Sequence, residues 1–372
     1  MSRTVSSHTS PLPWVSRLKP YVPGKPIEEL ERELGITGSI KLASNENPLG
    51  PSPLAVTAMQ CALASLHLYP DGGAYRLRGA LAEQLGVTAG EIVLGNGSNE
   101  VLSMICRAFL GTDHNAVVSQ YAFVAYRVVV GTQGAQLREV PAVSFGHDLS
   151  AMAAACDEMT RLLFVANPNN PTGTFSTVDE LRKLLRSVPE HVLVVVDEAY
   201  FEYVDRPDYC SALALRQERG NLVVTRTFSK AYGIAGIRVG YGVMPPDIAA
   251  TLNRLREPFN ANAAAQEGAL AALGDEVFLR RSVDLNRHER ARLQAALAVR
   301  GLEPVPSEGN FILFRSPVGG AELYDRLLRE GVIVRPLQPY GMLEHVRVTV
   351  GMAGENDRFL DSLDRVLGEG AR

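Results

Sequence analysis

The chain is organised around the stretch Asn221-Leu-Val-Val-Thr-Arg-Thr-Phe-Ser-Lys-Ala-Tyr-Gly-Ile-Ala-Gly-Ile-Arg-Val-Gly-Tyr241. An apolar run that predicts a buried strand leads into a loop broken by glycines, and Lys230 lies between the two. A lysine at a strand end can face a polar cleft, where its pKa is lowered and the amine becomes available for covalent chemistry. Ser229 and Arg238 are suited to bind a phosphate, one as a hydroxyl donor and one as a charged fork. A Ser-Lys pair alone is weak evidence, because most such pairs lie on a solvated surface.

A second apolar run ends in acidic residues, in Val192-Leu-Val-Val-Val-Asp-Glu-Ala-Tyr200. Asp197 closes the predicted strand, at the edge where ligands collect in open parallel sheets. Such a strand also resembles the magnesium-binding strand of a P-loop ATPase, but the only Gly-Lys, Gly24-Lys25, lacks the loop that this class requires. The alternative is structural, with Asp197 capping the next turn.

Two further apolar runs lead into polar loops. The first is Leu162-Leu-Phe-Val-Ala-Asn-Pro-Asn-Asn-Pro-Thr-Gly173, in which prolines fix the backbone and amide side chains are left to point outward. An ordinary rigid turn would have the same composition. The second is Gly95-Asn-Gly-Ser-Asn-Glu100, which opens an apolar helix and so predicts an anion site made of backbone N–H groups. It lacks the third glycine of a dinucleotide fingerprint.

The alternation of short apolar runs with amphipathic segments predicts an α/β protein, with a mostly parallel sheet and helices on both faces. Several of the runs are almost wholly apolar, as expected of strands covered on both sides. Seven strands are expected, at Ile92–Leu94, Ala116–Ser119, Gln136–Val140, Arg161–Ala166, Val192–Val196, Leu222–Thr227 and Arg238–Val243.

The rest of the chain predicts an arm and a smaller α+β domain built from both chain ends. Proline and charge dominate up to residue 40, which predicts an extended arm followed by a short helix around Ile27–Leu34. A long helix to about Arg300 suggests a hinge into a second set of strands and helices. The expected division is residues 1–45 for the arm and part of the small domain, 46–260 for the large domain and 261–372 for the small C-terminal domain.

Composition excludes several classes of function. The 372 residues are 46% hydrophobic, enough for a large core, and a net charge of -4 gives no basic field for nucleic acid or an anionic membrane. The N-terminus predicts no signal peptide, and no run reaches the roughly 20 apolar residues of a membrane span. The four cysteines lie far apart, which predicts reduced thiols in a cytoplasmic protein. No metal is expected, because no histidine has another histidine three or four residues away. No serine lies in the Gly-x-Ser-x-Gly motif of serine hydrolases.

Taken together, the motifs resemble those of a known family. Asn-Pro-Asn-Asn-Pro-Thr-Gly, Asp-Glu-Ala-Tyr and Ser-Lys-Ala-Tyr-Gly-Ile-Ala-Gly-Ile-Arg, in this order, resemble the fold-type I pyridoxal-phosphate aminotransferases. Four further motifs narrow the resemblance to the histidinol-phosphate aminotransferase family: Lys41-Leu-Ala-Ser-Asn-Glu-Asn-Pro-Leu-Gly50, Tyr-Pro-Asp-Gly, Gly-Asn-Gly-Ser-Asn-Glu and Val346-Arg-Val-Thr-Val-Gly351. The resemblance covers nearly the whole chain.

The resemblance implies a role for each motif residue toward pyridoxal 5'-phosphate. Lys230 would bond covalently to the cofactor and move a proton, and Asp197 would pair with the pyridine nitrogen, keeping it protonated. Tyr200 and Asn170 would hydrogen-bond the ring's O3′. The phosphate cradle would consist of Gly97, Ser98, Asn99, Thr227, Ser229 and Arg238.

The resemblance also implies a homodimer with a shared active site. Tyr69 would reach the phosphate of the neighbouring subunit's cofactor. Phe123 would lie over the pyridine ring. Family members often have tyrosine there and at Phe259, so the side-chain subsite of this chain is expected to be more apolar, and aromatic amino acids are candidate substrates.

Four residues are implied as substrate ligands. Arg347 would grip the carboxylate of glutamate and the phosphate of histidinol phosphate in turn, with Arg335, Tyr21 and Asn45 assisting. Arg335 could equally be a surface residue after a strand. The implied reaction converts histidinol phosphate and 2-oxoglutarate to imidazole-acetol phosphate and glutamate, in histidine biosynthesis. The alternatives are an aromatic amino-acid aminotransferase, a decarboxylase of a phosphorylated amino acid, and a PLP-binding regulator, for which the first 40 residues are too short and too weakly basic.

Overall fold

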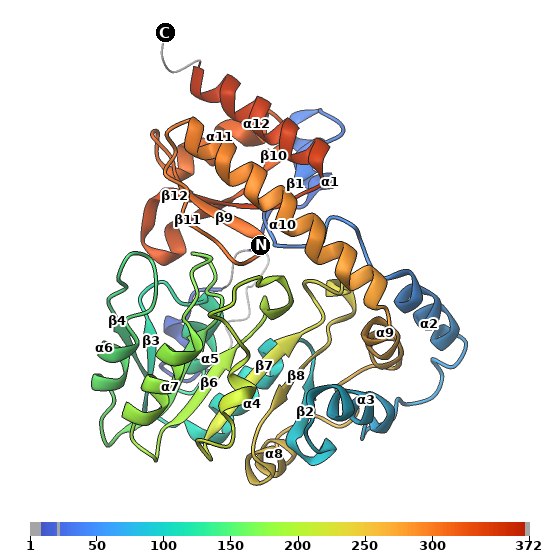
Figure 1. Cartoon of the computed structure of the whole chain (residues 1–372), viewed down its shortest axis with the longest axis vertical. Coiled ribbons are helices and arrows are strands. Elements are labelled where there is room, and N and C mark those ends of the chain that lie inside the picture. The colour runs from blue at the N-terminus through green and yellow to red at the C-terminus, as the bar shows by residue number, and fades with distance from the viewer. Residues whose placement is uncertain (1–8, 21–22, 369–372) are drawn as a thin grey trace, which may run out of the picture.

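A seven-stranded sheet forms the centre of the computed structural model, which describes residues 9–20 and 23–368 (Figure 1). The strand order is β2-β8-β7-β6-β5-β3-β4, and β8 runs antiparallel to both of its neighbours while the other pairs are parallel. The predicted α/β class and the seven strands are therefore confirmed. The strands are β2 Ile92–Gly95, β3 Asn115–Ser119, β4 Gln136–Val140, β5 Thr160–Ala166, β6 Leu193–Asp197, β7 Leu222–Thr227 and β8 Gly240–Val243.

Two hydrophobic layers cover this sheet, and alternate residues of each central strand enter opposite layers. In β5, Leu163 and Val165 join one layer, while Leu162 and Phe164 join the other. Side chains alternate along a strand, so a strand buried on both faces must be apolar throughout. One layer is closed by α2 Pro53–Leu63, α3 Tyr75–Leu85, α6 Leu149–Ala154, α7 Val178–Ser187 and α9 Ala263–Leu273. The other is closed by α4 Ser98–Phe109, α5 Val124–Gly131 and α8 Pro246–Asn253.

A smaller unit combines a segment near the start of the chain, α1 (Ile27–Leu34) and β1 (Ile40–Lys41), with the C-terminal part of the chain. Its antiparallel sheet has the order β11-β12-β9, formed by Arg335–Leu337, Met342–Thr349 and Phe311–Arg315. Next to it, β1 pairs in parallel with β10 (Val332–Ile333), which ties the segment after α1 to the C-terminal part of the chain. The helices α11 Gly320–Arg329 and α12 Ala353–Gly368 complete the unit.

The helix α10, Glu276–Val299, runs from α9 of the larger unit into the smaller unit (Figure 1). Near its C-terminal end Leu293 and Leu297 enter the core of the smaller unit. Near its beginning α9 packs on α2 and α3 of the larger unit. We propose to keep the predicted division at residues 45/46 and 260/261, with α10 as the connection.

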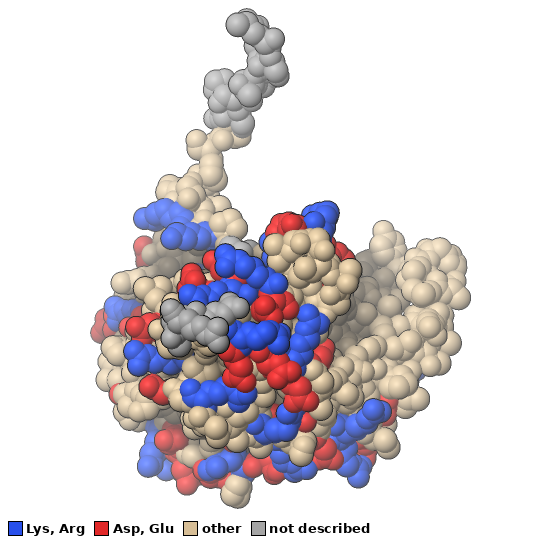
Figure 2. All heavy atoms as spheres, turned by 90° about the horizontal axis from the view of Figure 1, so that it is seen from above, with Lys and Arg blue, Asp and Glu red and all other residues tan. Residues whose placement is uncertain are grey.

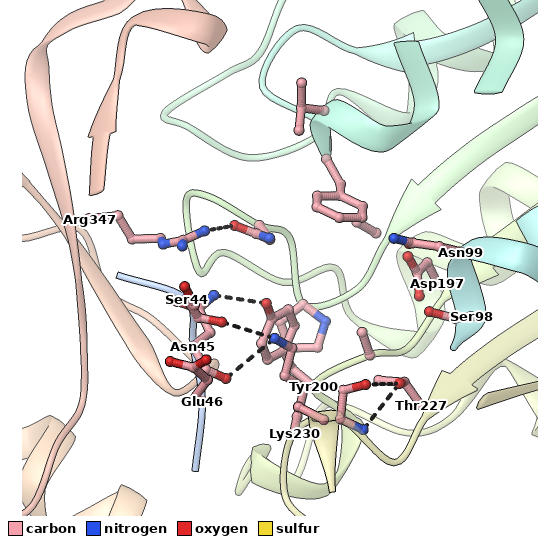
Figure 3. A pocket seen from close by; sticks show the side chains of 18 of the residues that line it. Ser44, Asn45, Glu46, Ser98, Asn99, Asp197, Tyr200, Thr227, Lys230 and Arg347 are labelled. Atoms are coloured by element: carbon pink, nitrogen blue, oxygen red, sulfur yellow. Dashed lines mark hydrogen bonds between the residues drawn. The ribbon is translucent and has the colours of Figure 1, made fainter. Parts of the chain in front are cut away.

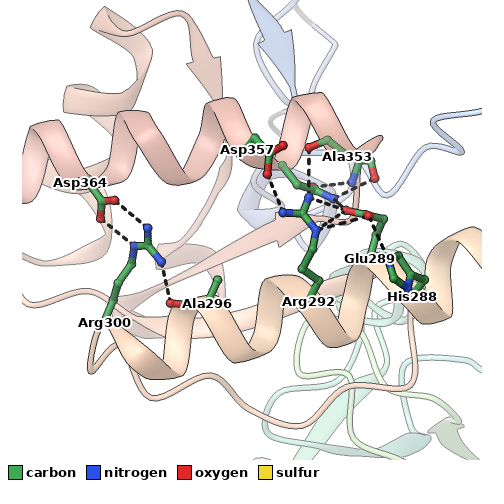
Figure 4. A network of polar contacts seen from close by, with 10 residues as sticks. His288, Glu289, Arg292, Ala296, Arg300, Ala353, Asp357 and Asp364 are labelled. Atoms are coloured by element: carbon green, nitrogen blue, oxygen red, sulfur yellow. Dashed lines mark hydrogen bonds and ion pairs between the residues drawn. The ribbon is translucent and has the colours of Figure 1, made fainter.

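Polar contacts fasten α10 to α12 along the outer face of the smaller unit (Figure 4). Arg300 donates to both carboxylate oxygens of Asp364, at 2.7 and 2.6 Å. Arg292 bridges Asp357, at 2.5 Å, and the buried Glu289, at 2.7 Å. Acidic and basic side chains lie interspersed over part of the face seen from above (Figure 2).

Several predicted boundaries differ from the observed ones. The strand expected from Arg238 begins at Gly240, because Arg238 adopts φ +59° and turns its guanidinium toward Ser229. The segment expected to be an extended arm contains a short 3-10 helix at Val15–Arg17, and the Trp14 indole donates to the carbonyl of Thr132 at 3.1 Å. No helix of the described residues is long and apolar enough to cross a membrane.

Candidate active site

A cavity of about 270 Å³ opens between the two units, at the carboxyl ends of the parallel strands (Figure 3). Most of the residues implied by the motifs contribute to its lining, although they come from strands and loops far apart in the sequence. Those lining the cavity are Asn45, Ser98, Asn99, Phe123, Asn170, Asp197, Tyr200, Thr227, Ser229, Lys230, Arg238, Arg335 and Arg347.

Among the described residues, Tyr69, Phe259 and Gly97 are implied by the motifs but do not line this cavity. Tyr69 is 82% exposed and stacks on Phe259, with ring centroids 4.6 Å apart, on the outside of the larger unit. The pocket position expected for Phe259 is therefore not found within a single chain. Tyr21 lies outside the described residues.

Lys230 follows β7 and extends its amine into the cavity. Nζ lies 3.3 Å from the carbonyl oxygens of Ser44 and Asn45, and 5.7 Å from the centre of the Tyr200 ring. Burial lowers the pKa of the amine from 10.5 to about 8, and the positive charge of Arg347 acts in the same direction. An amine with this pKa is partly uncharged near neutral pH, so it can act as a nucleophile and as a base.

Asp197 ends β6 as a buried carboxylate, 4% exposed. Burial raises its pKa from 3.8 to about 6, while hydrogen bonds from Tyr126 and Thr225 favour the charged form. Tyr126 Oη donates to Oδ2 and Thr225 Oγ1 donates to Oδ1, each at 3.0 Å. The carboxylate is thus fixed on both oxygens and still near its charge transition at neutral pH.

The sequence reasoning missed Tyr126 and Thr225. Thr225 lies two residues before Thr227 on β7, so the period of a strand gives both threonines the same face. Tyr126 lies three residues after Phe123, one turn along α5, and its ring packs edge-on against Phe123 at 5.9 Å. Both spacings are visible in the sequence, but the carboxylate as their shared partner is not.

The N-terminus of α4 meets the loop after β7 at a corner of the larger unit. Gly97 adopts φ +75° immediately before Ser98, and a Cβ at residue 97 would lie 2.5 Å from Arg238 Nη2. Arg238 Nη1 donates to Ser229 Oγ at 3.2 Å, and Ser229 is held by Thr227 Oγ1 at 2.9 Å. Backbone N–H groups, a hydroxyl and a guanidinium are the donor set of a phosphate site.

Two arginines lie at the side of the cavity formed by the smaller unit. Arg335 of β11 is directly opposite Arg347 of β12 in the antiparallel register, so the two side chains share one face. Arg347 is 6% exposed and donates to Asn170 Oδ1 at 2.5 Å and to the carbonyl of Ala43 at 2.6 Å. Tyr340, also missed from the sequence, lines the same side.

This donor set fits pyridoxal phosphate. The cavity lining combines donors suited to a phosphate, a buried acid suited to a protonated ring nitrogen, and the Lys230 amine, whose pKa permits covalent chemistry. No group of three or more His, Cys, Asp or Glu side chains within residues 9–20 and 23–368 could hold a metal ion. The fold and the site together define the class, a pyridoxal-phosphate enzyme of fold type I.

Comparison with known proteins narrows this class. Residues 37–363 match the family described as aminotransferase class I and II. Histidinol-phosphate aminotransferase 1 of Nitrosococcus oceani is 50% identical over 95% of this chain and 96% of its own length, and histidinol-phosphate aminotransferase 2 of Methylococcus capsulatus is 51% identical over 98% and 100%. The crystal structure of histidinol-phosphate aminotransferase from Sinorhizobium meliloti in complex with pyridoxal-5'-phosphate matches with a TM-score of 0.90 and 28% identity, over 99% of this chain and 100% of that one.

The chain belongs to the histidinol-phosphate aminotransferase family, within the class I and II aminotransferases. The resemblance read from the motifs, the enzyme class and the cofactor are thereby confirmed.

Proposed function

We propose that this enzyme transfers the amino group of histidinol phosphate to 2-oxoglutarate, giving imidazole-acetol phosphate and glutamate in a reversible step of histidine biosynthesis. About 50% identity to relatives of that name, over nearly the whole chain, supports this substrate. The paired arginines of β11 and β12 carry the proposal within the structure. Like charges directly opposite on a sheet repel each other, so an anionic ligand between Arg335 and Arg347 would be stabilised.

The arginine pair gives one site for two substrates. Histidinol phosphate has a phosphate and no carboxylate, whereas glutamate has carboxylates and no phosphate. A guanidinium binds either anion through parallel N–H donors. Arg347, which is fixed by Asn170 and Ala43, would bind the anion in both half-reactions, and Arg335 would add the second charge that a phosphate requires.

Bound pyridoxal phosphate supplies a carbonyl carbon that accepts the amino group and a ring that withdraws electrons from the bond being broken. Asp197 would hold the proton on the ring nitrogen, through a carboxylate fixed by Tyr126 and Thr225. Lys230 Nζ would take the proton from the substrate carbon that bears the amino group and return it at the end of each half-reaction. Tyr200 would donate a hydrogen bond to the ring's O3′, and Asn170 would assist.

The phosphate of the cofactor would lie in the corner between α4 and the loop after β7. The N–H groups of Ser98 and Asn99 would bind it at the helix N-terminus, which Gly97 leaves accessible. Ser229 and Arg238 would complete the cradle, with Thr227 orienting the Ser229 hydroxyl.

Phe123 supports a second candidate, an aromatic amino-acid aminotransferase, because this phenyl ring gives the cavity an apolar wall. Steady-state turnover with 2-oxoglutarate separates the two candidates. We expect kcat/KM for histidinol phosphate to exceed that for phenylalanine by about a hundredfold or more, since phenylalanine has no phosphate to interact with the second arginine. A preference for phenylalanine would favour the aromatic reaction, and carbon dioxide release without consumption of the oxo acid would indicate a decarboxylase.

We further propose that the enzyme works as a homodimer in the cytoplasm. Tyr69 and Phe259 are exposed and stack on each other, and Leu66 and Leu68, shortly before Tyr69 in the sequence, are exposed as well. A second copy of the chain could bury these apolar side chains. Tyr69 would then extend into the partner's cavity. Four free cysteines suit a reducing compartment.

A further inference from the structure

The loop that follows β1 has a role that the motif resemblance does not assign. Asn45 is 1% exposed and adopts φ +54°, a left-handed conformation that asparagine tolerates better than most residues. Its carbonyl accepts from Asn310 at 3.0 Å and lies 3.3 Å from Lys230 Nζ. The backbone turn therefore presents the Asn45 side chain to the interior, between the smaller unit and the cavity.

Both ends of the Asn45 amide have partners within the protein. Thr349 Oγ1 accepts from the Asn45 backbone N–H at 2.9 Å and donates to Asn45 Oδ1 at 3.2 Å. This closed pair leaves Nδ2 to donate to the hydroxyl oxygen of Tyr200, at 2.8 Å (Figure 3). A phenol that accepts one hydrogen bond keeps its own O–H for donation, so the Tyr200 proton is free to point into the cavity.

Thr349 lies two residues after Arg347 on β12, so both side chains lie on the same face of that strand. One strand thus carries the arginine proposed for the substrate anion and the hydroxyl that holds Asn45. Tyr200 is 3% exposed, and its ring packs edge-on against Phe311 of β9 at 5.1 Å. The titratable groups that influence its hydroxyl are Arg347, Asp197 and Tyr340, and Lys230 Nζ lies 5.7 Å from the centre of its ring.

We infer that Asn45 and Thr349 are positioning residues, which hold the Tyr200 hydroxyl as a hydrogen-bond donor toward the cofactor and connect it to the strand that carries Arg347. Asn45 then acts through Tyr200 and not as a ligand of the substrate. The inference rests on the proposed use of pyridoxal phosphate at this site but is independent of which amino donor is used.

The visible absorption band of the holoenzyme tests this inference, titrated with pH in the absence of substrate. A donor to an oxygen stabilises negative charge on that oxygen, so a correctly oriented Tyr200 lowers the pH midpoint of the band. Thr349→Val removes the hydroxyl at constant shape. Asn45→Asp replaces the donating NH₂ by an oxygen that takes the Tyr200 proton for itself, and aspartate tolerates the same backbone conformation. We expect both variants to move the midpoint upward by about one pH unit.

Three comparisons separate positioning from a general loss of structure. Thr349→Ser keeps the hydroxyl and should titrate like the parent. Thr160→Val removes a similarly buried hydroxyl at the first residue of β5, outside the lining of the cavity. This variant should leave the midpoint unchanged while lowering the thermal stability. The double variant Asn45→Asp/Thr349→Val should shift the midpoint no further than Asn45→Asp alone, because both changes act on one hydroxyl.

The inference is overturned by a Thr349→Val holoenzyme, or an Asn45→Asp holoenzyme if the former does not fold, that titrates like the parent. A KM for histidinol phosphate that rises in Asn45→Asp, with kcat and the band unchanged, would instead make Asn45 a substrate ligand. A parent enzyme that does not convert histidinol phosphate would contradict the proposed function. If the variants still shift the pH midpoint of the band, the positioning role would remain supported.

Discussion

At the scale of single residues, the site depends on two ionisable groups whose pKa values burial has moved toward neutral pH. Lys230 and Asp197 both lie in the cavity, and burial changes their pKa values in opposite directions, to about 8 and about 6. Each group therefore changes protonation more easily near neutral pH than it would in water. Function is supported at the expense of stability, because a buried group that would prefer its neutral form weakens the folded state.

The Asp197→Asn variant tests this opposition in the cofactor-free protein. The folded-state pKa of Asp197, about 6, lies above the value of 3.8 for an unperturbed aspartate, so the folded chain binds more protons between these values. The stability of the parent should therefore fall as the pH rises from about 4 to 6, by up to about 3 kcal/mol. Asparagine does not titrate, so the variant should gain stability relative to the parent across this window and keep the gain above it.

Chemical denaturation of both cofactor-free proteins between pH 4 and 8 measures this difference. The same variant should be nearly inactive with cofactor, since the ring nitrogen loses its acid. A stability difference between parent and variant that is constant over this pH range would contradict the assignment of a raised pKa to Asp197.

Arg335→Gln tests the arginine pair. We expect KM for histidinol phosphate to rise by about ten- to a hundredfold, because one charged donor to a phosphate is lost. The kcat/KM for phenylalanine, which has no phosphate, should change much less. Arg329→Gln, at the exposed end of α11, removes the same charge from the smaller unit outside the cavity and serves as the control. Equal losses for both substrates would mean that Arg335 does not distinguish a phosphate.

At the scale of elements, the start of α4 joins backbone geometry to cofactor binding. Gly97→Ala places a Cβ 2.5 Å from Arg238 Nη2 in a backbone of φ +75°. We expect a loss of about 1–2 kcal/mol in unfolding free energy from the backbone. Displacement of Arg238 should also weaken pyridoxal-phosphate affinity by about tenfold or more.

Gly86→Ala is the matched control for Gly97→Ala. Gly86, after α3, has φ +63°, and a Cβ there would meet nothing within 4 Å. Both variants should lose stability in denaturant titrations, but only Gly97→Ala should lose affinity for the cofactor in equilibrium binding. Equal cofactor affinities of the two variants would contradict the proposal that Arg238 binds the cofactor phosphate.

A helix or strand could be predicted from the sequence where its own burial determines its pattern of apolar residues. The apolar runs of β5 and β6 are continuous because helices cover both faces, and such a run is visible in the chain alone. The predicted first residue of β8, Arg238, was wrong because Arg238 takes a left-handed conformation that apolar patterning does not reveal. Sequence patterning also does not reveal that the neighbouring strands β10 and β11 pair with different partners.

The grouping of side chains at the cavity was predictable where a residue lies at the end of a strand, as Asp197 does in β6, or shortly after one, as Lys230 does after β7. It was not predictable where the partner comes from a distant element, as with Tyr126 beside Asp197 or Thr349 beside Asn45. Those pairs are separated by 71 and 304 residues, and only the assembled sheets bring them within hydrogen-bonding distance.

At the scale of the whole molecule, the cavity depends on both units. The larger unit contributes Asp197, Tyr200 and Lys230, while β12 of the smaller unit contributes Arg347 (Figure 3). Arg335 comes from the neighbouring strand β11. The helix α10 spans the two units and is fixed to α12 by ion pairs, so the smaller unit is attached through a rigid element. The relative position of the two units therefore sets the distance between the substrate anion and the Lys230 amine.

A mixed-dimer experiment tests the proposed assembly. Tyr69→Ala and Lys230→Ala should each yield a weakly active or inactive protein. Random exchange of subunits makes half of the dimers mixed, and each mixed dimer has one intact site, so the mixture should recover about a quarter of the parent's activity. Activity that stays at the average of the two separate variants would show that Tyr69 serves no neighbouring site.

The most direct test of the central claim is a single half-reaction. The pyridoxal-phosphate holoenzyme is mixed with histidinol phosphate in the absence of 2-oxoglutarate, and both the cofactor absorbance and the product are quantified. We predict one imidazole-acetol phosphate formed per active site, a cofactor band that returns when 2-oxoglutarate is added, and no conversion by Lys230→Ala. A holoenzyme that forms no imidazole-acetol phosphate, or that converts phenylalanine stoichiometrically at a higher rate than histidinol phosphate in a parallel experiment, would contradict the account.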